Sequence, residues 1–286
     1  MNHPTLRLDR RRTLAGLAGL GLGAALGGRS RSAAAAAPDD DTIYTFVLNL
    51  EYLEAEYYLR GTTGQGIGPD DIGANPGDVV GGSAVPFATD AIRQFAEEVA
   101  GNELAHVRYY RQSLGAKAID RPAIDLTAGF AAVGKAAGFG DNYSPFTDEL
   151  NFLLGGMLFE DVGVTGYKGA TPLITDKTKQ RDIAGVLAVE AYHMGMARSQ
   201  LYQAGETARQ AANAITVARG TLNGMPQIEQ GIEVDGHGNF VPSDDRGIAF
   251  TRTPQQVLQI VYVTPRTDIS RGGFFPNGVN GDLAST

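Results

Sequence analysis

The chain has 286 residues, of which 43% are hydrophobic and 20% are charged, and it contains neither Cys nor Trp. The lack of Cys excludes a disulfide framework, a thiolate-bound metal and a Cys nucleophile. The net charge of −8 at pH 7 argues against nucleic-acid binding, which needs a basic surface. The length is sufficient for one large domain or two small ones.

Residues 1–37 have the pattern of an export signal. A basic segment, Arg7–Arg12, precedes an apolar run from Thr13 to Gly28, and small residues follow that would suit cleavage within 33–38. The pair Arg11-Arg12 resembles a twin-arginine signal, which is read by a receptor. An ordinary secretory signal and an uncleaved anchor are the alternatives.

Removal of this segment changes the charge of the protein. Residues 1–37 hold six Arg and one Asp, so 18 basic and 31 acidic side chains would remain, with a net charge of −13. Such a charge favours solubility and attracts cations, and it disfavours anionic membranes. We expect a periplasmic or extracellular protein without stable membrane insertion after cleavage.

Four long helices are predicted in the rest of the chain, at 42–60, 89–114, 144–168 and 171–205. Gly residues end the first two, and Ser-Pro and Thr-Pro pairs begin the last two. Shorter helices are expected at 206–219 and 253–263, the connection 115–143 has room for another, and a hairpin is expected near 235–238.

Apolar side chains recur along each long helix at alternating spacings of four and three residues. This pattern is typical of the inward-facing seam of an antiparallel four-helix bundle. The loop lengths indicate two helical hairpins joined by a long crossover. We therefore expect an all-α fold, with the bundle at 38–220 and a C-terminal extension at 221–286 that packs on it.

Each apolar seam is interrupted at one level by residues that can bind metal, namely Glu51, Glu103 with His106, Glu160, and Glu190 with His193. Charged carboxylates in a bundle core destabilise the fold unless they are paired or bind a cation. Glu and His three residues apart share a helix face, so each Glu-x-x-His pair can offer an oxygen and a nitrogen to one ion. The sequence therefore predicts a site for two divalent cations.

Two tyrosines repeat the spacing of the acidic residues. Tyr58 follows Glu51 by seven residues, and Tyr167 follows Glu160 by seven, as an internal two-fold repeat would produce. They are candidates for hydrogen-bond donors beside the metals or for redox-active phenols, and the alternative is a purely structural aromatic with a hydrogen-bonded hydroxyl.

Glu54 and Glu56 lie off the main seam of the first helix. We expect both on a solvated face, with contact between Glu54 and the ligands as the alternative.

These residues resemble the ferritin-like di-metal carboxylate proteins, which have Glu on helices 1 and 3 and Glu-x-x-His on helices 2 and 4. The presence of two Glu-x-x-His motifs makes the sequence more similar to bacterioferritin and rubrerythrin than to classical ferritin, which keeps only one. The run Leu48–Tyr58 and the tail Gly272–Gly278 resemble the desiccation-related branch of bacteria and plants. The resemblance covers about residues 40–280 of this sequence.

The resemblance implies a pair of bound Fe ions, with a pair of Mn ions as the alternative, because mixed oxygen and imidazole ligands suit both metals. Glu103 and Glu190 would bridge the ions, His106 and His193 would each hold one of them, and the remaining two ligands, Glu51 and Glu160, would be terminal carboxylates.

The implied chemistry is oxidation of Fe(II) by O₂ or peroxide, or consumption of peroxide, in stress protection. Manganese catalase-like dismutation and a structural protective role with a structural or vestigial metal site are the alternatives. The long 61–86 segment and the C-terminal extension argue against a 24-subunit cage, and a smaller homo-oligomer remains open.

Overall fold

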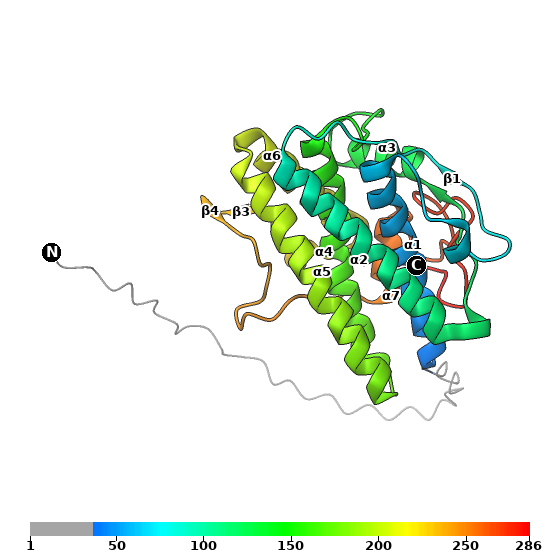
Figure 1. Cartoon of the computed structure of the whole chain (residues 1–286). Helices are drawn as coiled ribbons and strands as arrows, with labels where there is room; N and C mark the ends of the chain where they lie inside the picture. Colours follow the sequence, from blue (N-terminus) through cyan, green and yellow to red (C-terminus); the bar gives the residue numbers. More distant parts are fainter. Residues whose placement is uncertain (1–36) are drawn as a thin grey trace, which may run out of the picture. The chain divides into compact units, whose positions relative to one another are not determined.

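Four long helices pack together and carry the buried core (Figure 1). They belong to a computed structural model that describes residues 37–286, so the expected export signal lies outside the described residues except for its last position. The helices of this part, in chain order, are α1 (Asp40–Thr63), α2 (Asp90–Leu114), α3 (Leu126–Ala136), α4 (Glu149–Ala170), α5 (Lys177–Gln203), α6 (Glu206–Asn223) and α7 (Pro254–Val261). The prediction of an all-α helical bundle is confirmed.

The strands are short and lie outside the bundle. Strand β1 (Val79–Val80) pairs in parallel with β2 (Ile124–Asp125), and β3 (Glu233–Val234) pairs antiparallel with β4 (His237–Gly238) in the hairpin expected there. Single 3-10 turns lie at Pro69–Asp71, Gly115–Lys117, Thr171–Leu173 and Pro226–Ile228. Within residues 37–286, no helix combines the length and the apolar character that a bilayer crossing requires.

Aromatic contacts at one end of the bundle establish its topology. The Tyr44 hydroxyl, near the start of α1, lies 3.0 Å from the Tyr109 hydroxyl near the end of α2, so these helices are antiparallel. The Tyr110 ring stacks 6.4 Å from the ring of Tyr167, near the end of α4. Because α2 and α4 end at the same level, the chain between them must return along the bundle, and this is the predicted long crossover.

The predicted starts of the third and fourth helices were wrong. Helix α4 begins only at Glu149, because the Asp148 carboxylate accepts the backbone N–H of Asn151 at 2.9 Å. Helix α5 begins at Lys177, where Asp176 caps it in the same way. A side-chain acceptor, made stronger by its negative charge, satisfies the free N–H groups of a first turn, whereas the earlier Ser-Pro and Thr-Pro pairs form only short turns.

The first helix also extends past its predicted end at Gly61. It continues to Thr63 and stops at Gly64, which has a left-handed φ of 75°. Gly61 is needed instead for close packing, since a Cβ built on it would lie 2.1 Å from Cε2 of Phe152 on α4.

Glu56 is fully buried, so the expectation of a solvated side chain was wrong. Its carboxylate accepts the Arg60 Nε–H at 2.8 Å, a hydrogen bond from Arg121, and the backbone N–H of Ile67 at 3.3 Å. The two guanidinium groups neutralise it. Glu56 thus anchors the long segment after α1 to the connection that follows α2.

The C-terminal segment packs onto the bundle through aromatic side chains. Phe274 and Phe275 are fully buried, and the Phe274 ring lies 4.9 Å from that of Phe130 on α3 and 5.1 Å from that of Phe159 on α4.

A second buried contact of this region is ionic, and we call it the arginine cluster. It consists of Asp161, Arg198, Arg219, Glu229 and Arg252, all of them almost completely buried. Asp161 accepts two hydrogen bonds from Arg198 and one from Arg219, and Glu229 pairs with Arg219 and Arg252. The cluster ties α4, α5 and α6 to the chain that follows them.

Candidate metal centre

The six residues predicted as metal ligands come together in the middle of the bundle. Helix α1 supplies Glu51, α2 supplies Glu103 and His106, α4 supplies Glu160, and α5 supplies Glu190 and His193. The four carboxylates are fully buried, and the two imidazoles are 8% and 4% exposed. The helical spacing directs each side chain inward, as the seam pattern predicted.

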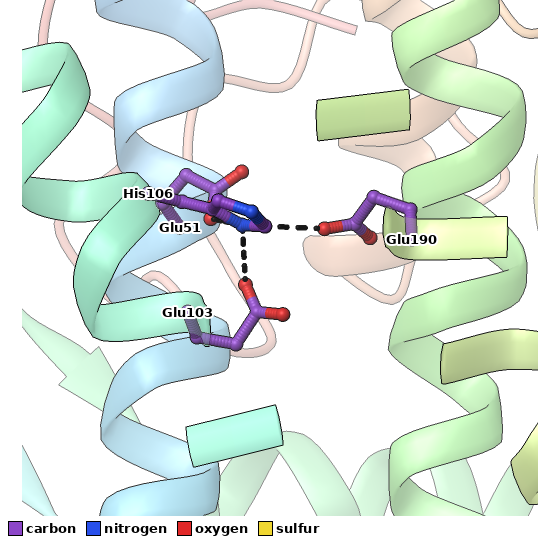
Figure 2. Close-up of side chains that lie close together, drawn as sticks. All are labelled: Glu51, Glu103, His106 and Glu190. Carbon is purple, nitrogen blue, oxygen red and sulfur yellow. Dashed lines mark hydrogen bonds and ion pairs between the residues drawn. The ribbon is translucent and has the colours of Figure 1, made fainter. Parts of the chain in front are cut away.

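One half of the centre is built around His106 (Figure 2). Its Nδ1 atom lies 3.2 Å from Glu51 Oε2, 3.3 Å from Glu103 Oε2 and 3.7 Å from Glu190 Oε1. One donor atom from each of these four residues lies within 4.8 Å of the others. In Figure 2, Glu190 reaches from its helix across to the imidazole, which lies beside Glu51 and Glu103.

The other half is built around His193. Its Nδ1 atom lies 3.1 Å from Glu103 Oε1 and 3.3 Å from Glu160 Oε2. Together with Glu190, these residues form a second group whose donor atoms lie within 4.8 Å of one another. The two groups share Glu103 and Glu190, the residues expected to bridge two ions.

The donor atoms fit a metal site because many of them make no hydrogen bond of normal geometry within the described chain. Among the described residues, five buried carboxylate oxygens make no hydrogen bond: Glu103 Oε1, both oxygens of Glu160 and both of Glu190. Unpaired buried carboxylates are strongly destabilising, and they are usually explained by an ion or water. Two divalent cations between the carboxylates would satisfy these oxygens and cancel their mutual repulsion.

A glycine makes room for one of these side chains. A Cβ built on Gly163 of α4 would lie 2.2 Å from Glu190 Oε2. Any larger residue at this position would therefore displace a shared carboxylate.

Burial and charge strongly shift the acid–base properties of the centre. Burial raises the pKa of Glu51 to about 8, and burial together with Glu103 raises the pKa of Glu190 well above its usual range. Burial opposes protonation of the imidazoles, but Glu51 and Glu160 outweigh it and raise the pKa of His106 to about 11 and that of His193 to about 10. The metal-free centre therefore retains protons near neutral pH, and cations would displace them.

Glu103 behaves differently from the other carboxylates. Although its burial favours the neutral form, the hydrogen bond with His106 and the close contact with the His193 imidazole lower its pKa below the usual range. It is the carboxylate that stays ionised, in contact with both imidazoles.

The two predicted tyrosines lie beside the centre, and each faces the Glu of the opposite helix. Tyr167 of α4 donates a hydrogen bond to Glu51 Oε1 on α1. Burial raises the pKa of Glu160 on α4, and Tyr58 of α1, which lies toward this carboxylate, opposes part of the rise. Among the described residues, the buried Tyr58 hydroxyl makes no hydrogen bond of normal geometry. The Glu and Tyr that lie seven residues apart on one helix are therefore not paired with each other; each Tyr instead faces the Glu of the other helix.

Glu54 adds a further carboxyl near the centre and is only 5% exposed, so the solvated position expected for it was wrong. Burial, followed by the charges of Glu103 and Glu160, raises its pKa well above the usual range. Its position one turn after Glu51 was a signal for this placement, since residues three apart share a helix face.

Asn102 is a contact residue that the sequence did not indicate. Its Nδ2 atom lies 3.1 Å from Nε2 of His193, so it contacts the imidazole on the side away from the carboxylates. It precedes Glu103 and lies off the apolar seam, where an Asn carries no distinguishing pattern.

Comparisons with known proteins agree with this architecture. The model of the ferritin-like domain matches residues 39–203. The chain is 32% identical over 249 residues to the desiccation-related protein PCC13-62 of Craterostigma plantagineum, covering 77% of this chain and 76% of that protein. It is 28% identical over 275 residues to the ferritin-like catalase Nec2 of Nesocodon mauritianus, covering 86% of this chain and 85% of that protein.

No solved structure matches the chain significantly. The expected resemblance to ferritin-like proteins is nevertheless confirmed by a domain match over more than half of the sequence and by a relative that spans most of it. The chain belongs to the ferritin-like domain family.

Proposed function

We propose that this chain is an exported ferritin-like protein that consumes peroxide at a pair of bound metal ions. The observation that carries the proposal is the pair of donor groups that share Glu103 and Glu190. Each group contains one imidazole and three carboxylates, a donor set for iron or manganese. In this proposal Glu103 and Glu190 would hold both ions, and each of the other four residues would hold one.

Iron is the proposed metal and manganese the alternative. A bound pair of either metal would supply one-electron chemistry at each ion, which suits oxidation of Fe(II) by peroxide or O₂ as well as peroxide dismutation. The name of the relative Nec2, a ferritin-like catalase, supports peroxide as the reactant.

The protein's own residues would orient the ligands. The hydrogen bond from Tyr167 occupies Glu51 Oε1, which leaves Oε2 directed toward His106 and the centre. Asn102 contacts Nε2 of His193, so that Nδ1 faces Glu103 and Glu160. Such outer contacts hold metal ligands in position and typically change metal affinity by about 10- to 100-fold when they are lost.

Export remains part of the proposal. It rests on the basic and apolar pattern of residues 1–37, which suits the twin-arginine route, because that route carries proteins already folded around their metal. N-terminal sequencing of the secreted protein tests it, with a first residue within 33–38 expected.

Metal analysis of the mature protein, purified from the exported compartment without added metal, is the first test. We expect a pair of Fe ions per chain and release of O₂ or loss of peroxide on mixing. The double variant His106→Ala/His193→Ala should lose metal and activity, whereas His237→Ala, at an exposed position, should retain both. A pair of Mn ions would favour dismutation, and no metal after attempted reconstitution with Fe(II) and Mn(II) would contradict the proposal.

The desiccation-related relative supports a second candidate, a structural protective protein in which metal only stabilises the bundle. The same double variant separates the two, because a structural role predicts lower stability and no turnover in either form.

A further inference from the structure

A cavity of about 560 Å³ lies between α2 and α5 and reaches the metal centre. Its lining includes His193, a proposed ligand, and Asn102, which contacts the imidazole. Figure 1 shows these two helices running alongside each other. The cavity therefore joins the outside of the bundle to one half of the centre.

The walls of this cavity are mainly apolar. Phe95 and Val99 line it from α2, and Val189, Tyr192 and Met196 line it from α5. Val99 is fully buried, whereas Tyr192 is 72% and Met196 47% exposed. The cavity is thus open to the outside beside Tyr192 and Met196 and apolar toward Val99, and the polar side chains of Gln94, Glu98, Asn102 and His193 also line it.

The size of the cavity exceeds what hydrogen peroxide requires. Pockets of roughly 300–1,000 Å³ with apolar walls and a few polar groups are typical of sites for small organic ligands. Hydrogen peroxide has only two heavy atoms and no apolar part, so it would use neither the volume nor the aromatic walls.

We propose that the cavity binds neutral alkyl and aryl hydroperoxides, with the apolar body between Phe95 and Tyr192 and the –OOH group at Asn102 and His193. This inference rests on the proposed function and names a further substrate class for it. Reduction of R–OOH to R–OH and water breaks the O–O bond and takes up two electrons and two protons. A pair of divalent iron or manganese ions held by the centre would supply the two electrons, one from each ion, in a single turnover.

Charge restricts the substrates further. Glu98 also lines the cavity, and the chain after residue 37 carries a net charge of −13. Anionic hydroperoxides, such as those of fatty acids, would be repelled, and neutral compounds would not. Cumene hydroperoxide is a suitable probe because it combines a neutral –OOH group with an aromatic ring.

Binding is measured with cumyl alcohol, the unreactive alcohol of this probe, so that no turnover is needed. Calorimetric titration of the purified protein should give saturable binding with one site per chain. Val189→Trp should fill the cavity and weaken this binding at least tenfold while the metal content is unchanged. Ala188→Trp, a matched change at the neighbouring exposed position outside the cavity, should leave binding and metal content unchanged.

Met196→Trp is the second variant, since a large side chain at the exposed mouth can obstruct entry even if Val189→Trp does not fold. Both cavity variants should slow consumption of cumene hydroperoxide more than that of hydrogen peroxide. No saturable binding, or binding that both variants leave intact, would overturn the inference, even if the protein binds metal and consumes hydrogen peroxide. A metal-free protein that still binds the alcohol would instead contradict the proposed function and support the cavity as a ligand site.

Discussion

Two neighbouring carboxylates of α4, Glu160 and Asp161, lie in opposite electrostatic environments. Asp161 accepts hydrogen bonds from Arg198 at 2.8 and 2.7 Å and from Arg219 at 2.6 Å. Its burial favours the neutral form, but these guanidinium groups outweigh it and lower its pKa to about 2. Glu160 is also buried, neither of its oxygens makes a hydrogen bond of normal geometry with residues 37–286, and its pKa is raised mainly by burial.

The comparison separates a structural cluster from a binding site. In the arginine cluster, three cationic side chains face two anionic ones, so both carboxylates are paired with guanidinium groups and the cluster needs no added cation. In the metal centre, carboxylates from four helices face two imidazoles and one another, and their free oxygens need a cation. Adjacent residues of one helix thus serve different roles because they face different neighbours.

The largest effect is expected from a substitution in the metal centre. Glu190→Gln removes a shared carboxylate, and we expect loss of both ions and a fall in peroxide consumption of at least about 100-fold, the upper end of the effect of lost outer contacts. In the presence of chelator at alkaline pH, the same variant should raise the melting temperature, because a neutral amide avoids the cost of burying a charge beside Glu103, which raises the pKa of Glu190. Glu206→Gln, at an exposed position on α6, is the control, and a stable metal-loaded Glu190→Gln protein would contradict the bridging role.

Asp161→Asn tests the arginine cluster. It leaves buried guanidinium groups without their carboxylate, which typically costs about 3–5 kcal/mol of unfolding free energy. Chemical denaturation should show this loss, whereas Asp90→Asn, with a side chain 87% exposed, should change stability by less than about 0.5 kcal/mol. The metal content of the folded Asp161→Asn protein should be unchanged, and metal loss would show that the two clusters are not independent.

The pH dependence of stability should distinguish the clusters by its sign. The pKa values of His106 and His193, about 11 and 10 in the folded chain, lie above the ordinary 6.5. Above pH 6.5 the folded metal-free chain therefore holds more protons than the unfolded chain. Its free energy of unfolding should fall by about 1.4 kcal/mol per pH unit for each such proton as the pH rises. The lowered pKa of Asp161 acts oppositely, since its stabilisation is present above pH 3.8 and is lost as the pH falls toward 2.

This prediction is checked by measuring the midpoint of urea denaturation from pH 2 to 9, once with chelator and once with metal. Bound cations replace the extra protons, so metal should flatten the loss at alkaline pH and steepen the loss at acidic pH, where protons displace the cations from their ligands. An alkaline loss of equal size in both samples would contradict the assignment.

The smallest expected effect concerns the two tyrosines. Tyr167→Phe removes the hydrogen bond to Glu51 and should weaken metal binding about tenfold. Tyr58→Phe should weaken it less, because the Tyr58 hydroxyl makes no hydrogen bond of normal geometry within the described chain. Competitive titration with a metal chelator measures both, and equal effects would mean that the two halves of the repeat are equivalent.

Local patterns predicted much of the fold and of the candidate site. The four seams, and the convergence of residues such as Glu51 and His106, follow from the helical period alone. The period could not reveal which charged side chains outside the seams are buried. Glu54 and Glu56 were expected in solvent and lie inside, because distant residues, Arg121 among them, determine their surroundings.

The sequence by itself determined the helical bundle and the single level at which four helices carry Glu and His, because both depend on spacing along one helix. Only the tertiary structure decided how these helices meet. It paired Tyr167 with Glu51 across helices, neutralised Asp161 with Arg198 and Arg219, and left a cavity beside His193. Such contacts join residues far apart in the chain, and their geometry depends on helix packing that no local pattern specifies.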